Sequence, residues 1–270
     1  MAMIVDEQKL HTIIARPEPL PGPATLSRAG KVFFVGGNLP VNETLETMFE
    51  SFCMESTDLF HLSFGTRHDF FRGEEMARQI KKNFNVRLMG RFPYPAPAHT
   101  IERAYAAGVD MLDISAADMD SASSNERRSV RQDFRDSLAA AVRLLPRWST
   151  ASTLVIGEEL STAVMNSIDL LLEAGVMPLV TLSSRVTLHQ AEDLAAVFAH
   201  LASGWEQHRA TLKPLLPLIS QTTPLVLAEN TGRVRSIINR IHDRHSLATS
   251  DLLRHLRVVP AKDSLDSAGL

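Results

Sequence analysis

The chain has 270 residues, of which 44% are hydrophobic and 22% charged, with a formal net charge of -3. This length can bury one sizeable core, and the near-neutral charge excludes a basic surface of the kind that favours nucleic acid. No apolar run approaches the roughly 20 residues of a membrane-spanning helix, and Asp6, Glu7 and Lys9 lie where a signal peptide would be apolar. The single cysteine, Cys53, cannot form an internal disulfide, and we expect a cytoplasmic protein with no membrane or nucleic-acid partner.

Residues 1–30 differ in composition from the rest of the chain. Pro17, Pro19, Pro21 and Pro23 fix their backbone φ angles and lack an amide proton, so they are incompatible with a regular helix. We therefore predict that residues 1–30 form an extended, proline-rich N-terminal arm that lies over the surface.

Residues 31–201 repeat a pattern of strand, polar loop and helix at intervals of about 25 residues. This pattern is typical of consecutive βα units, so we predict an α/β fold with a parallel sheet. Its leading architecture is a partial TIM-type (β/α) barrel, and a full barrel remains the alternative. The loops that follow the strands gather on one face of such a barrel, where a functional site is expected. The predicted strands are Lys31–Val35, Leu59–Phe64, Val86–Met89, Val109–Ile114, Thr153–Ile156 and Val176–Leu182.

The pattern weakens after Leu201. We predict that residues 202–270 form a mostly helical C-terminal extension that closes the barrel. The sequence PLVLAEN at residues 224–230 is a possible further strand. If this segment and HLRVVPA at residues 255–261 both join the sheet, the barrel has eight strands. Otherwise it stops at six strands.

The segment from Val109 to Arg185 contains several short motifs in a particular order. A strand ending in LDIS is followed by a long helix, a strand ending in the glycine-acid pattern VIGEE, and a strand that begins with AGVMP. In this order and spacing the chain resembles the second half of a radical S-adenosylmethionine barrel, in the branch that includes biotin-synthase-like proteins. The resemblance extends over residues 31–201, about two thirds of the chain.

The resemblance assigns Gly36-Gly37-Asn38 to the family's Gly-Gly-Glu element, which holds the amino group of the methionine moiety. Asn38 replaces the acid and removes its charge. The family also needs three thiolates in a C-x3-C-x2-C loop to hold a [4Fe–4S] cluster, and this loop would precede residue 31. Residues 1–30 contain no cysteine. We therefore expect no iron–sulfur cluster of the chain's own and no radical catalysis, and binding of S-adenosylmethionine remains open.

The resemblance implies further cofactor-binding residues at the ends of later strands. Ile156 and Gly157, followed by Glu158, fall where the family packs backbone and apolar side chains against adenine. Asp113 and Ser115 end their strand where ribose or methionine contacts are commonly made.

The loop TRHDFF, which follows the second predicted strand, contains Arg67, His68 and Asp69. An imidazole beside an acid can act as a base, and a guanidinium can bind a carboxylate or phosphate. Together with Glu158, these are the predicted catalytic residues if the protein is an enzyme. The alternative is a structural loop held by an Arg–Asp pair and an N-capping aspartate. No HExxH or paired-cysteine motif is present, so no metal site is predicted.

The loop RFPYPAPAH is unusual between a strand and a helix, because three prolines stiffen it. Phe92, Tyr94 and Pro95 offer apolar and aromatic surface, which favours contact with a partner protein or a lid over the site. Ordinary loop rigidity is the alternative.

Two classes of function follow from these observations. The first is a pseudoenzyme: a radical-SAM-like barrel without a cluster that acts as an accessory, scaffold or maturation subunit in contact with a protein partner. An iron–sulfur or cofactor-assembly system is the kind of system that such a subunit would serve. The second is a non-radical barrel enzyme that acts on a small anionic or carbonyl-bearing molecule. The fold does not decide between them. The deciding observation is whether the polar side chains are satisfied by one another or left unpaired for a ligand.

Overall fold

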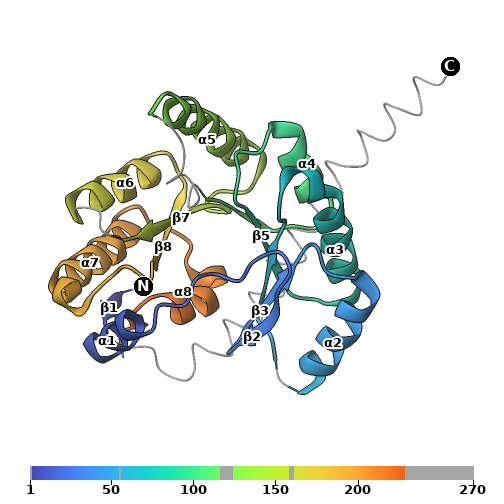
Figure 1. Ribbon diagram of the computed structural model, residues 1–270, viewed down its shortest axis with the longest axis horizontal. Helices are drawn as coiled ribbons and strands as arrows, with labels where there is room; N and C mark the ends of the chain where they lie inside the picture. Colours follow the sequence, from blue (N-terminus) through green and yellow to red (C-terminus); the bar gives the residue numbers. More distant parts are fainter. Residues whose placement is uncertain (1, 55, 116–123, 158–160, 229–270) are drawn as a thin grey trace.

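The computed structural model describes residues 2–54, 56–115, 124–157 and 161–228, which form a mixed α/β fold around a curled sheet (Figure 1). This sheet has seven strands. The first strand is antiparallel to the second, and all later neighbours are parallel. In spatial order the strands are β2 (Leu26–Ala29), β3 (Val32–Gly36), β4 (Leu59–Ser63), β5 (Arg87–Phe92), β6 (Met111–Ile114), β7 (Thr150–Ile156) and β8 (Met177–Leu182).

The six predicted strands are present as β3 to β8, so the prediction of an α/β fold with consecutive parallel strands is confirmed. The sheet curls into a half-barrel and does not close on itself (Figure 1). At its β8 edge, Pro178 has no amide proton to donate to a further strand. The indole Nε1 of Trp205 donates to the carbonyl oxygen of Pro178 at 3.2 Å. These two features protect the edge from pairing with another strand.

One helix follows each parallel strand and packs on the outer, convex side of the sheet (Figure 1). Successive strand residues point to opposite faces. Phe33 of β3, Phe60 of β4 and Leu88 of β5 pack with Met76 and Ile80 beneath the outer helices. The strand residues directly before and after these three therefore face the hollow of the half-barrel. The outer helices are α2 (Val41–Met54), α3 (Phe70–Asn83), α4 (Ala98–Ala106), α5 (Ser124–Leu144), α6 (Ser161–Glu173) and α7 (Ala191–Gln207).

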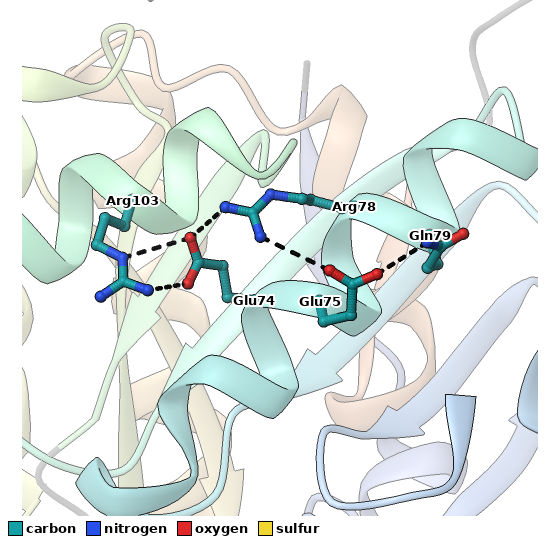
Figure 2. A network of polar contacts seen from close by, with 5 residues as sticks. All are labelled: Glu74, Glu75, Arg78, Gln79 and Arg103. Atoms are coloured by element: carbon teal, nitrogen blue, oxygen red, sulfur yellow. Dashed lines mark hydrogen bonds and ion pairs between the residues drawn. The ribbon is translucent and has the colours of Figure 1, made fainter. Parts of the chain in front are cut away.

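Charged side chains on the convex side are paired where they are buried. Figure 2 shows Glu74 of α3, which is 2% exposed, between Arg78 of the same helix and Arg103 of α4. Arg78 Nη2 lies 2.5 Å from Glu74 Oε1, and Arg103 reaches both carboxylate oxygens. Glu75 and Gln79 extend the network along the surface of α3. The network therefore joins α3 to α4.

A second buried pair joins α3 to the sheet. Lys81 Nζ donates to Asp110 Oδ2 at 3.2 Å and to the carbonyl oxygen of Val86 at 3.2 Å. The same carboxylate oxygen accepts the backbone N–H of Leu88 in β5 at 2.9 Å. Both side chains are largely buried, with exposures of 11% for Lys81 and 4% for Asp110.

The N-terminal segment departs from the prediction of an extended arm. β1 (Met3–Val5) and α1 (Glu7–Ala15) are regular elements, and Asp6 caps α1 by accepting the backbone N–H of Lys9 at 3.0 Å. Leu10 and Ile14, four residues apart, share one buried face of α1, and this burial stabilises the helix. The prediction is therefore wrong for these residues. The prolines lie after α1, in a segment without helix or strand.

The gap in the half-barrel is occupied by elements from both ends of the described chain. α8 (Leu216–Thr222) packs against β8 and against β9 (Leu225–Leu227), and Figure 1 shows it inside the open side of the sheet. A Cβ added at Gly30, in the turn between β2 and β3, would lie 2.5 Å from Nε2 of Gln221 in α8. α8 thus spans the gap between β8 and the β2–β3 hairpin.

The possible strand in PLVLAEN forms as β9, but it lies outside the main sheet. It pairs antiparallel with β1, with Ile4 opposite Val226. The alternative of an eight-stranded barrel through this segment is therefore wrong. The segment HLRVVPA and the tail of the predicted C-terminal extension lie outside the described residues. Within the described ranges, no helix is both long and apolar enough to cross a membrane.

Candidate functional site

A row of polar side chains lies at the carboxyl ends of the parallel strands, on the concave face. The strand register places Ser63 of β4 beside Arg91 of β5, and Arg91 beside Asp113 of β6. Thr153 of β7 completes the row through its hydrogen bonds to Asp113. We call the region lined by Ser63, Arg91, Asp113 and Thr153 the mouth of the half-barrel. In folds with parallel strands, this end of the sheet is where ligands bind.

Arg91 is the cation of the mouth, and its side chain is 14% exposed. Its Nε lies 3.8 Å from Oδ2 of Asp113, which is within ion-pair range and too far for a hydrogen bond. No residue in the described ranges accepts a hydrogen bond from this buried Nε. A guanidinium carries five N–H donors in a planar fork that matches a carboxylate or phosphate. Arg91 therefore has donor capacity that the described protein does not use.

Asp113 is fully buried, and Thr153 of the neighbouring strand fixes the position of its carboxylate. Its two carboxylate oxygens accept from the backbone N–H of Thr153 at 2.8 Å and from the Thr153 hydroxyl at 2.7 Å. Burial raises the pKa of Asp113, and the charge of Arg91 and the Thr153 hydrogen bonds oppose that rise. Ser115, also fully buried, donates its hydroxyl to the Thr153 carbonyl at 3.1 Å. The structure thus brings two predicted residues, Asp113 and Ser115, to the wall of the mouth.

His61 of β4 lies one layer below the mouth and is 1% exposed. In the strand register it stands opposite Met89, two residues before Arg91 in β5. Neither ring nitrogen has a hydrogen-bond partner among the residues described. Burial, and then the charge of Arg91, lower the pKa of His61 to about 3. The ring, held against Phe34 with 5.3 Å between centroids, is therefore neutral near pH 7 and offers one donor and one acceptor.

The predicted catalytic loop is hydrogen-bonded to two neighbouring loops. Arg67, in the 3-10 helix η1 (Arg67–Asp69), donates to the carbonyl oxygen of Pro95 at 2.9 Å. Asp69 accepts from the hydroxyl of Thr66 at 2.7 Å and from the amide of Asn38 at 3.4 Å. The Thr66 hydrogen bond is the main cause of a lowered Asp69 pKa. Arg67 and Asp69 thus hydrogen-bond to groups of the protein itself, in their own loop and in the loops that contain Asn38 and Pro95.

The remaining features of this loop also differ from the patterns considered in the sequence. His68 is exposed on η1 and does not enter the mouth row. The alternative of an Arg–Asp pair is not formed either, since Arg67 is bonded to Pro95. Asp69 precedes α3 but makes no side-chain capping hydrogen bond to it. The loop is therefore held by other contacts than those of the structural alternative.

The Gly36-Gly37-Asn38 element is packed against the protein's own backbone. Gly36 N–H donates to the Thr25 carbonyl at 2.8 Å, and Gly37 N–H to the Ser63 carbonyl at 2.8 Å. A Cβ at Gly36 would lie 2.2 Å from the carbonyl oxygen of Pro23, so glycine is required there. The close approach that these glycines permit is that of the proline-rich segment. The backbone N–H groups of Gly36 and Gly37 are therefore already engaged.

The other predicted cofactor residues lie at the end of β7. Ile156 is buried, and its carbonyl oxygen accepts the backbone N–H of Ser183 at 2.8 Å. A Cβ at Gly157 would lie 3.1 Å from the Ser183 hydroxyl, so Gly157 also faces β8 closely. Glu158 lies outside the described residues.

The proline-rich loop after β5 does not present its aromatic residues as expected. Phe92 is fully buried, with its ring 4.6 Å from that of Phe64, so its assignment as a partner contact is wrong. Tyr94 is half-buried between Phe92 and the guanidinium of Arg67, and its hydroxyl has no partner in the described part of the chain. Burial raises the pKa of Tyr94 to about 12. Pro95 contributes the carbonyl that anchors Arg67.

No protein-family model matches the chain, and no curated protein matches it. The resemblance to radical S-adenosylmethionine barrels therefore stays a prediction. Among the described residues, no group of three histidine, cysteine, aspartate or glutamate side chains lies where it could hold a metal ion. The candidate site rests on its own geometry.

Sequence reasoning did not single out Arg91 and His61 as the central pair. A signal was present: both interrupt otherwise apolar strands, in LFHLS and in RLMGRF. A polar side chain in a buried strand needs a partner. Which face of the strand it occupies, and which strand lies beside it, depends on the register.

Proposed function

We propose that this half-barrel binds a small anionic molecule in its mouth, with Arg91 as the group that holds the anion. This corresponds to the small-anion function predicted from the sequence, with the binding group moved from Arg67 to Arg91. The observation that carries the proposal is the buried Arg91 Nε without a hydrogen-bond acceptor in the described structure. A buried donor left unpartnered costs about 1–3 kcal/mol, which an anion in the mouth would recover.

The arrangement of the mouth supports this proposal in two further ways. Asp113 is fixed by Thr153, so it does not approach Arg91 closely enough to saturate the guanidinium. The guanidinium is held in a mostly buried position, where the attraction between opposite charges is stronger than in water. A small anion that reaches Arg91 would form charge-assisted hydrogen bonds, which are about twice as strong as neutral ones.

The test is urea unfolding in sodium acetate and in sodium chloride at equal ionic strength. We expect acetate to stabilise the protein, by about 1.4 kcal/mol when its concentration is ten times the dissociation constant. Arg91→Gln should remove the difference between the two salts. Arg87→Gln is the matched control, because Arg87 lies on the same strand and the same face, at the opposite end of β5. An equal acetate effect in Arg91→Gln would refute the proposal.

A second candidate is the accessory or scaffold role that the family resemblance implies. The observation that favours it is that Arg67 and Asp69 hydrogen-bond to Pro95 and Thr66 of the chain itself, as expected of residues with a structural role. Under this role the partial TIM-type barrel would bind a protein partner. The test is co-purification from the native host, with partners quantified by mass spectrometry. We expect a stoichiometric partner of the wild-type protein that is lost when Arg67→Ala removes the hydrogen bond anchoring Pro95 of the proline-rich loop. Absence of a partner from the wild-type preparation would count against this role.

A further inference from the structure

We infer that a groove between α2 and α3 binds an amphipathic helix of a partner protein, with apolar side chains against Phe49 and lysine or arginine side chains beside Glu46 and Glu50. The groove has a volume of about 410 Å³. Because α2 and α3 cover the convex side of the sheet (Figure 1), the inference rests neither on the anion site in the mouth nor on Arg67. The groove is lined by Leu45, Glu46, Phe49 and Glu50 of α2, by Asn83 of α3, and by Phe84, which follows α3.

The groove presents aromatic surface that the fold itself does not bury. Met48 is the fully buried residue of α2, whereas Leu45 is half-buried and the neighbouring Phe49 is 58% exposed. Phe84 is only 3% exposed, and its ring centroid lies 6.4 Å from that of Phe49. Phe84 therefore forms the floor of the groove, and Phe49 forms an open wall. Exposed aromatic side chains beside a hollow are typical of the centres of protein interfaces.

Two carboxylates border this aromatic surface. Glu46 and Glu50 are exposed and lie four residues apart on α2, so they share one side of the helix and repel one another. Among the described residues, neither forms an ion pair with a cation, and the lining of the groove contains none. A cation placed between the two carboxylates would replace this repulsion by attraction. The occupant that complements the groove therefore carries positive charge beside apolar side chains.

The position of the groove favours a helix as the occupant. α2 and α3 contact one another as neighbouring helices of the half-barrel (Figure 1). A groove between two such helices accepts the side-chain ridge of a third helix, whose apolar residues recur at intervals of three and four. Leu45 and Phe49 are themselves four residues apart and match this interval. A helix laid along the groove would also cover the exposed ring of Phe49.

The experiment uses a labelled synthetic peptide of leucine and lysine, about 14 residues long, with its leucines on one helix face. A second peptide has glutamate in place of every lysine, and a third has the first composition in an order without an apolar face. Binding to the full-length protein is measured by fluorescence anisotropy. We expect the first peptide to bind at least about tenfold more tightly than either of the others.

Substitution of the aromatic wall locates the binding site of the peptide. Phe49→Ala should weaken binding of the lysine peptide about tenfold, because an aromatic side chain at the centre of an interface contributes this much. Phe71→Ala is the matched control, since Phe71 of α3 is 61% exposed and does not line the groove. Its affinity should stay within about twofold of wild type.

Substitution of the carboxylates tests the charge of the occupant. Glu46→Gln combined with Glu50→Gln should weaken binding of the lysine peptide about fivefold. Glu102→Gln combined with Asp133→Asn is the control, because it removes the same charge from exposed positions on α4 and α5. This control should bind within about twofold of wild type. Equal losses in the two double variants would show that only the net charge matters and would overturn the inference.

The remaining outcomes concern the groove and its occupant. The inference is wrong if no peptide binds, if the lysine and glutamate peptides bind equally, or if Phe49→Ala binds as wild type does. It is also wrong if an arginine-rich peptide of residues 231–246 binds through Phe49 more tightly than the lysine peptide, since the occupant would then be a segment of this chain. A dimer that dissociates in Phe49→Ala during sedimentation would identify a second copy instead. None of these results bears on the acetate effect at Arg91.

Discussion

Buried polar groups on the two faces of the sheet differ in whether they have hydrogen-bond partners. On the convex side, Glu74 meets two arginines, and Asp110 meets Lys81 and a backbone N–H. On the concave side, the Nε of Arg91 and both ring nitrogens of His61 have no hydrogen-bond partner in the described residues. The helices that cover the convex side supply partners across the interface. Among the described residues, none supplies such a partner to Arg91 Nε or to the His61 ring, and this is the observation behind the proposed anion site.

We therefore expect the paired groups to contribute to stability and the unpaired groups to contribute to ligand binding. Paired groups on the convex side should stabilise the fold, and their removal should be costly. Unpaired groups on the concave side should cost stability in the empty protein, and their replacement should be tolerated or stabilising. The following expectations test the comparison in order of decreasing effect.

Asp110→Ala should be the most damaging substitution, at about 3 kcal/mol of unfolding free energy, because it leaves Lys81 and the Leu88 N–H buried without this acceptor. Urea unfolding measures the effect. The matched control is Asp58→Ala, which removes an exposed pair with Lys31 and should cost less than about 1 kcal/mol. Similar losses of unfolding free energy in the two variants would contradict the stabilising role of the buried pair.

Glu74→Ala should lower the free energy of unfolding by about 2 kcal/mol. The carboxylate is buried, but Arg78 and Arg103 are about half exposed and can return to water once it is gone, which limits the loss. Glu75→Ala, one residue along α3, removes an exposed acid of the same network and serves as the control. We expect it to stay within about 0.5 kcal/mol of wild type.

The pH dependence of stability should carry a contribution from His61. The pKa of His61 is about 3 in the folded chain and about 6.5 in the unfolded chain. Between these values the unfolded state binds more protons, so this contribution falls as the pH is lowered. Asp113, whose pKa is raised by burial, contributes with the opposite sign. The wild-type protein should therefore lose about 1 kcal/mol more than His61→Leu between about pH 6 and pH 5.

His61→Leu itself should raise the unfolding free energy by about 1 kcal/mol near pH 7, since an apolar side chain replaces a buried ring with no partners in the described protein. Destabilisation by more than about 1 kcal/mol would mean that His61 already has a structural role, and the contrast between the faces would be weakened.

Tyr94→Phe should have the smallest effect, below about 1 kcal/mol, because it removes one buried hydroxyl and leaves the ring against Phe92. Tyr94 lies in the loop after β5, and its ring packs with the convex core. Tyr94→Phe therefore tests whether position matters: an unpartnered polar atom outside the mouth should not influence carboxylate binding. A changed acetate affinity in Tyr94→Phe would contradict the placement of the site.

Much of the fold could be predicted from the sequence, because runs such as Val176–Leu182 are apolar and bounded by turns. The N-terminal helix was missed because four prolines in residues 17–23 outweighed the spacing of Leu10 and Ile14. Strand PLVLAEN was recognised as a strand, but its partner depends on where β1 lies. Local sequence carries no information on such long-range pairing.

The candidate site could be predicted less well. Asp113 and Ser115 were placed correctly at a strand end, because a polar residue that closes an apolar run marks the edge of the sheet. Arg67 and Asp69 were predicted to be catalytic if the protein is an enzyme, and the structure shows them hydrogen-bonded to Pro95 and Thr66. Adjacent residues in a loop give no indication of which distant group they contact.

The most direct test of the mouth is a titration of the wild-type protein with acetate, followed through the arginine Nε–H resonances by NMR. The Arg91 resonance is assigned by its absence from the spectrum of Arg91→Gln. If Arg91 holds the carboxylate, this resonance should shift with acetate and saturate, while that of Arg87 stays in place. An Arg91 resonance that does not move while others respond, or a spectrum that does not respond at all, would contradict an anion site in the half-barrel.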